Sequence, residues 1–160
     1  MSLAPTQPCA DHPPSALVEG VALFNRGEFF ECHEVLEGLW KAERRPIRDL
    51  FQGIIQVAVG LHHMNRGNRR GALFGLNHGA VRIARFGPSC YGIDIRRLLD
   101  DVQAVLAQIE TSPEVGVGTL SSVVAPQIRF AGEVGTESGQ IDNASPTSSE
   151  TRARGDADAP

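Results

Sequence analysis

His33 and Glu37 stand four residues apart in the segment FNRGEFFECHEVLEGLW, and Trp40 follows three residues later. On a helix, residues four apart lie on one face, so the imidazole and the carboxylate are neighbours and Trp40 continues their stripe. An imidazole and a carboxylate can bind a metal ion or move a proton. The spacing therefore predicts a polar site on one face of a helix.

The pentapeptide HEVLE at residues 33–37 is similar to the HExxH pattern of zinc metalloproteases, with Glu37 in place of the second histidine. His33 and Glu37 are therefore candidate metal ligands, and Glu34 and Glu37 are candidate catalytic carboxylates. The set is one ligand short, and His62 or His63 could supply it. The sequence establishes no cofactor, and a divalent metal ion is the candidate.

His63 shares a helix face with Gln52 and Gln56, because it follows them by eleven and seven residues. Two interpretations stay open. In the first, the polar side chains bond to one another inside the bundle and fix the register of its helices. In the second, they form a ligand pocket. The candidate pocket residues are His33, Glu37, Trp40, Gln52, Gln56 and His63.

A basic zone lies further along the chain, where Asp94 is the only acidic residue between Met64 and Arg97. Its candidate phosphate or nucleic-acid contacts are Arg66, Arg69, Arg70, Arg82 and Arg85. No aromatic stacking platform accompanies these arginines. Glu28, Glu31, Glu34 and Glu43 could pair with them instead. A solvated or internally paired face is the favoured interpretation, and nucleic-acid binding is not expected.

Apolar residues at a 3.6-residue period predict five helices. The predicted spans are 16–25, 28–43, 47–65, 69–86 and a last one from 95 to about 110, separated by Gly, Asn and Pro signals. Ser15 and Asp94 are the predicted N-caps of the first and last helices. Gly71, Gly75 and Gly79 are spaced so that another helix could approach closely, either inside the domain or in a homo-oligomer.

The predicted architecture is an all-α compact bundle of about five helices with a disordered C-terminal tail. We expect a flexible N-terminal arm over residues 1–14, a helical domain over 15–110, and a Gly/Ser/Pro-rich, largely disordered tail over 111–160. Within this tail, the segment PQIRFA is expected to dock in extended form. No strand pairs of useful length are predicted.

Cysteine content and the N-terminal sequence favour a protein of the reducing cytoplasm. The net charge of −4 comes from residues 111–160, because residues 1–110 hold twelve acidic and twelve basic side chains. Cys9, Cys32 and Cys90 form no CxxC pair, so neither a zinc knuckle nor a disulfide framework is predicted. The N-terminus has no signal-peptide pattern, and no apolar run is long enough to span a bilayer, so no membrane partner is expected.

Several motifs in one order resemble a known family, the small all-α domain of unknown function 309. They are the HxxxExxW pattern of His33, Glu37 and Trp40, the lead-in of Phe24, Asn25, Gly27, Glu28 and Phe29, the Gln52, Gly53 and Gln56 helix, and the turn of Gly67, Asn68, Gly71 and Ala72. The resemblance covers about residues 15–110. It implies a compact all-α domain and no activity, since the family has no established one.

Overall fold

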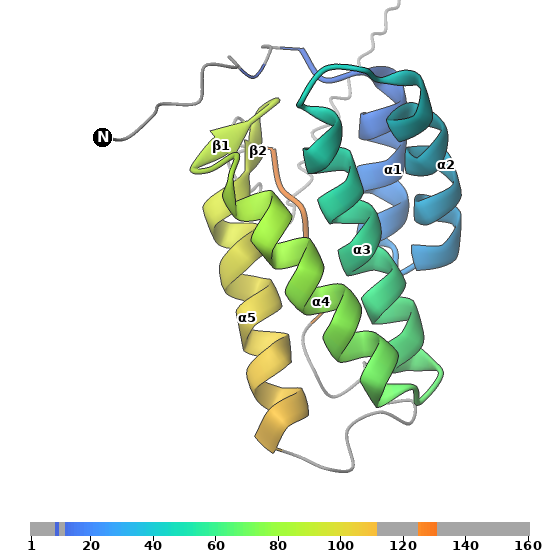
Figure 1. The fold of residues 1–160 in the computed structure, drawn as a ribbon, viewed down its shortest axis with the longest axis vertical. Coiled ribbons are helices and arrows are strands. Elements are labelled where there is room, and N and C mark those ends of the chain that lie inside the picture. Colours follow the sequence, from blue (N-terminus) through green and yellow to red (C-terminus); the bar gives the residue numbers. More distant parts are fainter. Residues whose placement is uncertain (1–8, 10–11, 112–124, 131–160) are drawn as a thin grey trace, which may run out of the picture.

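The computed structural model describes Cys9 and residues 12–111 and 125–130 of the 160-residue chain. Five helices and one two-stranded hairpin make up its regular structure, and the predicted all-α bundle is confirmed (Figure 1). In chain order the elements are α1 (Ser15–Asn25), α2 (Phe29–Ala42), α3 (Arg48–Asn65), α4 (Arg69–Ala84), β1 (Ser89–Cys90), β2 (Ile93–Asp94) and α5 (Ile95–Thr111).

Several helix ends lie at the Gly and Asp residues that the sequence predicted for them. Gly27 (φ 82°) and Gly67 (φ 77°) adopt the left-handed backbone that ends α1 and α3. Asp94 caps α5 by accepting from the Arg97 amide at 3.0 Å, as predicted. The predicted cap at Ser15 is wrong, because Ser15 is the first helical residue and Pro14 precedes it without any side-chain cap bond.

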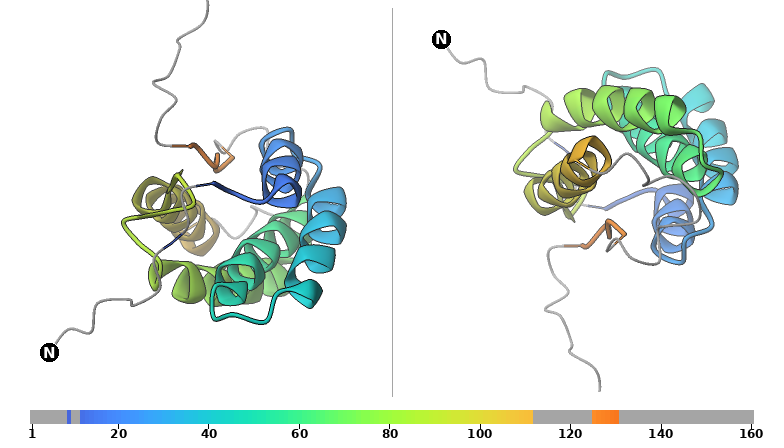
Figure 2. Two further views of the ribbon diagram at one scale, coloured as in Figure 1. Left: turned by 90° about the horizontal axis from the view of Figure 1, so that it is seen from above. Right: turned by 90° about the horizontal axis from the view of Figure 1, so that it is seen from below.

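Consecutive helices pack on one another, and α3 lies between α2 and α4 (Figures 1 and 2). The α3–α4 contact is close because glycine backbones meet there. A Cβ on Gly75 would lie 2.7 Å from the Gln56 carbonyl oxygen and 2.8 Å from Gly60 Cα, while one on Gly79 would lie 2.7 Å from the Gly53 carbonyl oxygen. The glycine spacing on α4 therefore serves packing inside the domain.

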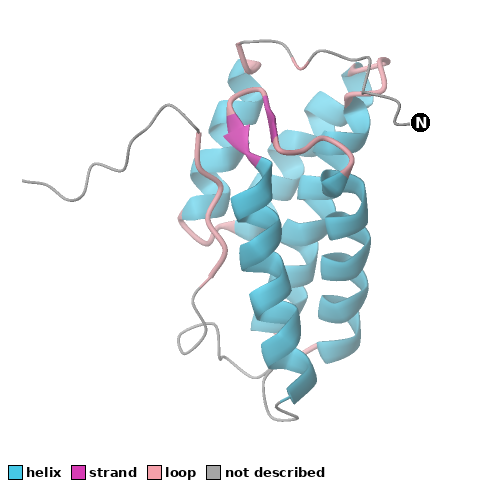
Figure 3. Cartoon of the chain, turned by 90° about the vertical axis from the view of Figure 1, so that its left-hand side faces the viewer, coloured by secondary structure: helices cyan, strands magenta, loops and turns pink. Residues whose placement is uncertain are grey.

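A short hairpin connects α4 to α5 at one end of the bundle (Figure 3). Its two central residues, Tyr91 (φ 53°) and Gly92 (φ 79°), both occupy the left-handed region, as a type I′ turn requires. Each strand has only two residues, so this hairpin is consistent with the expectation that no strand pair of useful length forms.

Residues 125–130 pack along the bundle between α1 and α5 (Figure 2). Ile128 is 1% exposed and belongs to the core, and Phe130 pairs with Ile93 through a β-bridge. Asn25 at the end of α1 holds the backbone of Ile128 through two hydrogen bonds. The expected docking of this segment in extended form therefore agrees with the structure, while the rest of the predicted tail from residue 112 onward lies outside the described residues.

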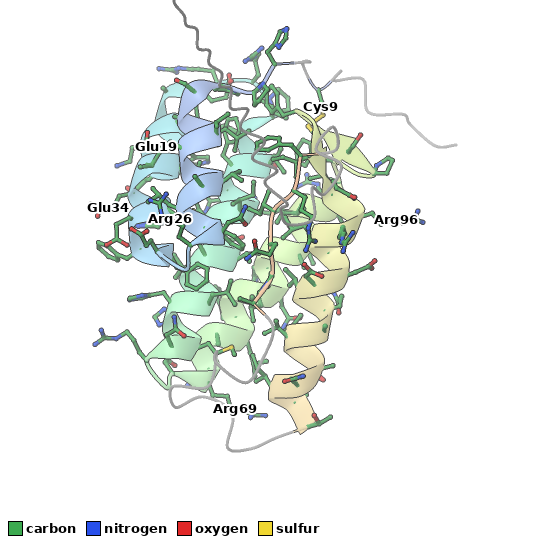
Figure 4. The ribbon with its side chains drawn as sticks, turned by 180° about the vertical axis from the view of Figure 1, so that it is seen from behind. Cys9, Glu19, Arg26, Glu34, Arg69 and Arg96 are labelled. Atoms are coloured by element: carbon green, nitrogen blue, oxygen red, sulfur yellow. A yellow bond between two sulfur atoms is a disulfide. The ribbon has the colours of Figure 1, made fainter. Side chains whose placement is uncertain are left out.

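A disulfide joins Cys9 to Cys90 of β1, 81 residues apart (Figure 4). The sequence interpretation missed this pair because two cysteines so far apart carry no local signal. Apart from Cys9 and residues 12–14, the predicted N-terminal arm lies outside the described residues. Among the helices that the structure describes, none has both the length and the apolarity needed to cross a bilayer.

Candidate functional site

His33 and Glu37 form the predicted pair on α2. The His33 Nε2 atom lies 3.1 Å from Glu37 Oε2, and the other carboxylate oxygen of Glu37 lies 2.9 Å from Lys41 Nζ. The hydrogen bond and charge of Lys41, with a smaller contribution from His33, hold the pKa of the Glu37 carboxyl below its ordinary value. Glu37 is therefore ionised near neutral pH, and it orients the imidazole.

A cavity of about 580 Å³ lies over α3 between α2 and α4, and we call it the α3 cavity. Its floor is a helical stripe of α3, and α2 and α4 supply its walls. Ile55, Val59 and Phe74 give it apolar surface. The full lining is His33, Gln52, Ile55, Gln56, Val59, His63, Asn68, Arg70, Gly71, Phe74 and Gly75. The volume is within the range of small-molecule sites, about 300–1,000 Å³.

Asn68, the N-cap of α4, selects the tautomer of the neutral His63 ring. Its Oδ1 accepts from the Gly71 amide at 2.9 Å, so its Nδ2 is the atom that faces His63 Nδ1, at 3.2 Å. His63 Nδ1 is then the acceptor, and the ring proton sits on Nε2. Gly71 makes room for this ring, since a Cβ there would lie 2.7 Å from His63 Cγ.

Gln56 is oriented in the same way from α4. Arg82 Nε donates to Gln56 Oε1 at 3.0 Å, so the amide NH₂ is the end left for other partners. In the described part of the chain no hydrogen bond uses this NH₂, the Gln52 amide, the His63 Nε2–H or the Arg70 guanidinium. The α3 cavity therefore offers four groups that can donate hydrogen bonds, and its lining includes no Asp or Glu.

His33 adds one acceptor to this set. Because its Nε2 faces the Glu37 carboxylate, the neutral ring places its proton on Nε2 and leaves a lone pair on Nδ1. That Nδ1 is buried and has no hydrogen-bond partner. A buried nitrogen without a partner is uncommon in folded proteins, and it marks this wall of the cavity as incompletely satisfied.

Not every predicted pocket residue reaches the α3 cavity. The structure brings together His33, Gln52, Gln56 and His63, whereas Glu37 and Trp40 are not part of the lining. Trp40 packs against the edge of the core, and the Arg48 guanidinium lies 4.5 Å from its ring centroid. Glu34 is exposed on the outer side of α2 and points away from the bundle (Figure 4). The expected network forms in part: His33 bonds to Glu37 as expected, whereas Gln56 and His63 bond to α4 and its N-cap instead of to these residues.

The candidate metal ligands His33, Glu37 and His63 do not form a three-ligand cluster. Among the described residues, no group of three or more His, Cys, Asp or Glu side chains is arranged to hold a metal ion. Cys32, next to His33 in sequence, is fully buried in the core, and burial raises the pKa of its thiol to about 12. It remains a protonated core residue, as the sequence indicated.

The basic zone is partly neutralised, but not by the residues proposed for it. Arg82 and Arg85 on α4 pair with Asp49 of α3, at 3.3 and 3.2 Å. The expected partners on or beside α2 have other contacts, since Glu28 pairs with Arg26 and Glu43 with Arg45. The zone does have an aromatic pair that sequence reasoning missed: the exposed rings of Phe74 and His78 stack on α4 with centroids 4.0 Å apart.

Sequence reasoning also missed the α4 side of the cavity, which Asn68, Arg70 and Phe74 supply. Asn68 was noted only as part of a turn motif and Arg70 only as part of the basic zone. Helical spacing identifies neighbours along one helix, but it does not say which residues of the next helix face them.

The fold and this cavity define a small all-α bundle with a polar site on its third helix. Residues 17–74 match the family described as "Domain of unknown function (DUF309)", which agrees with the resemblance seen in the sequence. The matched range includes His33, Glu37 and Trp40 of the HxxxExxW pattern.

Two similar proteins have names that describe them as uncharacterised. "Uncharacterized protein YpuF" of Bacillus subtilis (strain 168) is 35% identical over 118 residues, which are 71% of this chain and 64% of the relative. An "Uncharacterized protein" of Aquifex aeolicus (strain VF5) is 26% identical over 101 residues, 62% of this chain and 29% of the relative. The chain thus covers less than two thirds of either relative, and neither name states an activity.

Proposed function

We propose that the domain binds a small organic anion in the α3 cavity. The observation that carries this proposal is a set of four unused donors in a cavity with no acidic side chain in its lining: the Gln52 NH₂, the Gln56 NH₂, the His63 Nε2–H and the Arg70 guanidinium. Carboxylate, sulfonate and phosphate groups accept hydrogen bonds from such donors, and a charged partner makes each bond stronger.

The apolar part of the lining indicates the rest of the ligand. Ile55, Val59 and Phe74 lie in the same cavity as these donors. Binding sites of this kind combine apolar walls with a few polar groups that fix the orientation of the ligand. An inorganic ion would leave this apolar surface unused, so an anion with a hydrocarbon portion is the better match.

The first test is a titration with hexane-1-sulfonate, a permanently charged anion with an apolar chain, followed by amide chemical shifts in NMR spectra. We expect shifts in residues that line the α3 cavity. Gln56→Glu keeps the oxygen that accepts from Arg82 and replaces the NH₂ donor with a negative oxygen. We expect this variant to keep its fold and to bind at least about tenfold more weakly, because one charged hydrogen bond is lost and a repulsion added.

The matched control is Gln103→Glu, the same substitution at an exposed position of α5. It changes the net charge equally and should leave the affinity unchanged. If wild-type protein gives no shifts at the cavity, or Gln56→Glu binds as well as wild type, the proposal is wrong.

The remaining functional expectations stay predictions. Glu34 and Glu37 as catalytic carboxylates, a divalent metal at His33 and Glu37, and self-association are each compatible with an anion-binding domain. The cytoplasmic location also stays a prediction. The Cys9–Cys90 disulfide argues against a reducing compartment, because such bonds are rare there.

A further inference from the structure

A second, smaller hollow adjoins the α3 cavity, and we call it the ring hollow. Its volume is about 200 Å³, and it is lined by Phe29, Phe30, His33, Val59, His62 and His63. Three of these residues, His33, Val59 and His63, also line the α3 cavity. The two hollows therefore share a wall, and a single elongated molecule could occupy both.

Aromatic rings from α2 and α3 dominate the ring hollow. The Phe30 ring centroid lies 5.9 Å from that of His33 and 5.8 Å from that of His62, and the His62 ring lies 6.3 Å from that of His63. These separations are within the 4.5–7 Å at which aromatic pairs attract one another. Phe30 is 50% exposed, so a large part of its ring is free to contact another group.

We infer that the ligand of this site is an aromatic anion, whose planar ring lies in the ring hollow against Phe30 and His62. This inference rests on the proposed function, since the charged group of the same molecule would meet the donors of the α3 cavity. The alternative of a flexible alkyl chain in the ring hollow is less favoured, because most of the lining consists of rings, which attract another ring through edge-to-face and offset-stacked contacts.

Phe74 provides the comparison that makes the inference specific. It is also exposed, at 62%, and it lines the α3 cavity, but its ring already stacks on His78 with centroids 4.0 Å apart. Phe30 has only tilted ring neighbours near 6 Å. The free aromatic surface is thus at Phe30, on the side of the ring hollow, and the ligand ring is expected there and not on Phe74.

The experiment compares naphthalene-1-sulfonate with hexane-1-sulfonate on wild type, Phe30→Leu and Phe74→Leu, using the full chain. Leucine keeps an apolar side chain and removes only the ring. We expect Phe30→Leu to weaken naphthalene-1-sulfonate binding about fivefold, as loss of an aromatic contact implies, and to change hexane-1-sulfonate binding less than about twofold. Phe74→Leu should affect both probes equally.

Other outcomes separate this inference from the proposed function. If both sulfonates bind and Phe30→Leu weakens neither, or weakens both alike, the aromatic assignment is wrong and anion binding stands. If only Phe74→Leu weakens naphthalene-1-sulfonate selectively, the ring lies on α4 and its placement here is wrong. If wild type binds neither probe, the proposed function fails and this inference fails with it.

Discussion

The side chain of Asn25 bonds to both backbone groups of Ile128, a residue 103 positions away in sequence. Its Nδ2 donates to the Ile128 carbonyl oxygen at 2.9 Å, and its Oδ1 accepts from the Ile128 amide at 2.8 Å. An amide side chain can replace a strand neighbour in this way, because it offers one donor and one acceptor side by side. The end of α1 thereby fixes a segment that closes the bundle beside α5.

Replacing Asn25 with alanine should therefore destabilise the fold. Asn25→Ala leaves the amide and carbonyl of Ile128 without partners in a half-buried position, which costs about 1–3 kcal/mol in the free energy of unfolding. Urea unfolding followed by circular dichroism measures this. Asn77→Ala is the control, because the exposed Asn77 bonds only to Leu73 of its own helix. Equal losses in the two variants would contradict the role given to Asn25.

Two glycines in helices should respond in opposite directions to alanine. Gly75→Ala places a Cβ 2.7 Å from a backbone oxygen of α3, so α3 and α4 must separate, and overpacking of this kind costs about 1–3 kcal/mol. A Cβ at Gly38 on α2 meets nothing within 4 Å, so Gly38→Ala should stabilise the protein by up to about 1 kcal/mol. Thermal unfolding of both variants tests the pair, and a Gly75→Ala protein as stable as wild type would refute the close packing.

The pKa of Glu37 should depend on Lys41. The folded-state pKa of Glu37 lies below the ordinary value of 4.5. The contact of ionised Glu37 with Lys41 therefore stabilises the fold above that pH, and this contribution is lost as the pH falls through the lowered pKa. In Lys41→Met, a carboxyl-detected NMR titration should find the pKa of Glu37 raised toward the ordinary value. Lys41→Arg retains the charge and should retain most of the lowering. An unchanged pKa in Lys41→Met would show that another group is responsible.

The Cys9–Cys90 bond should contribute to stability only under oxidising conditions. A cross-link between residues 81 apart restricts the unfolded chain, and such bonds typically add about 2–4 kcal/mol. Cys9→Ser should lower the urea midpoint of the oxidised protein and match wild type when both are kept in excess dithiothreitol. Titration of the unfolded, unreduced protein should find one free thiol, that of Cys32. A count of three would mean that the bond does not form.

Local sequence patterns predicted the helices of this domain. They also predicted the polar cavity residues that come from a single helix, α3. Periodicity and glycine turns placed α3 within one residue of its observed start, and helical spacing put Gln52, Gln56 and His63 on one stripe. The features that were missed depend on contacts between distant segments. The docking of α4 on α3, which brings Arg70 and Phe74 to the cavity, is set by glycine backbones meeting across two helices.

The pairing of Cys9 with Cys90 also has a mechanical consequence. The helices α1 to α4 all lie between these two cysteines in the sequence, so a force that pulls the ends of the oxidised chain apart passes directly from Cys9 to the hairpin. Among the described elements, β2, α5 and the segment of residues 125–130 follow Cys90 and lie in the path of that force, whereas α1 to α4 do not. Stretching a single oxidised molecule should therefore not extend the residues between the two cysteines, and reduction should release roughly 270 Å of further length, at about 3.3 Å for each bypassed residue.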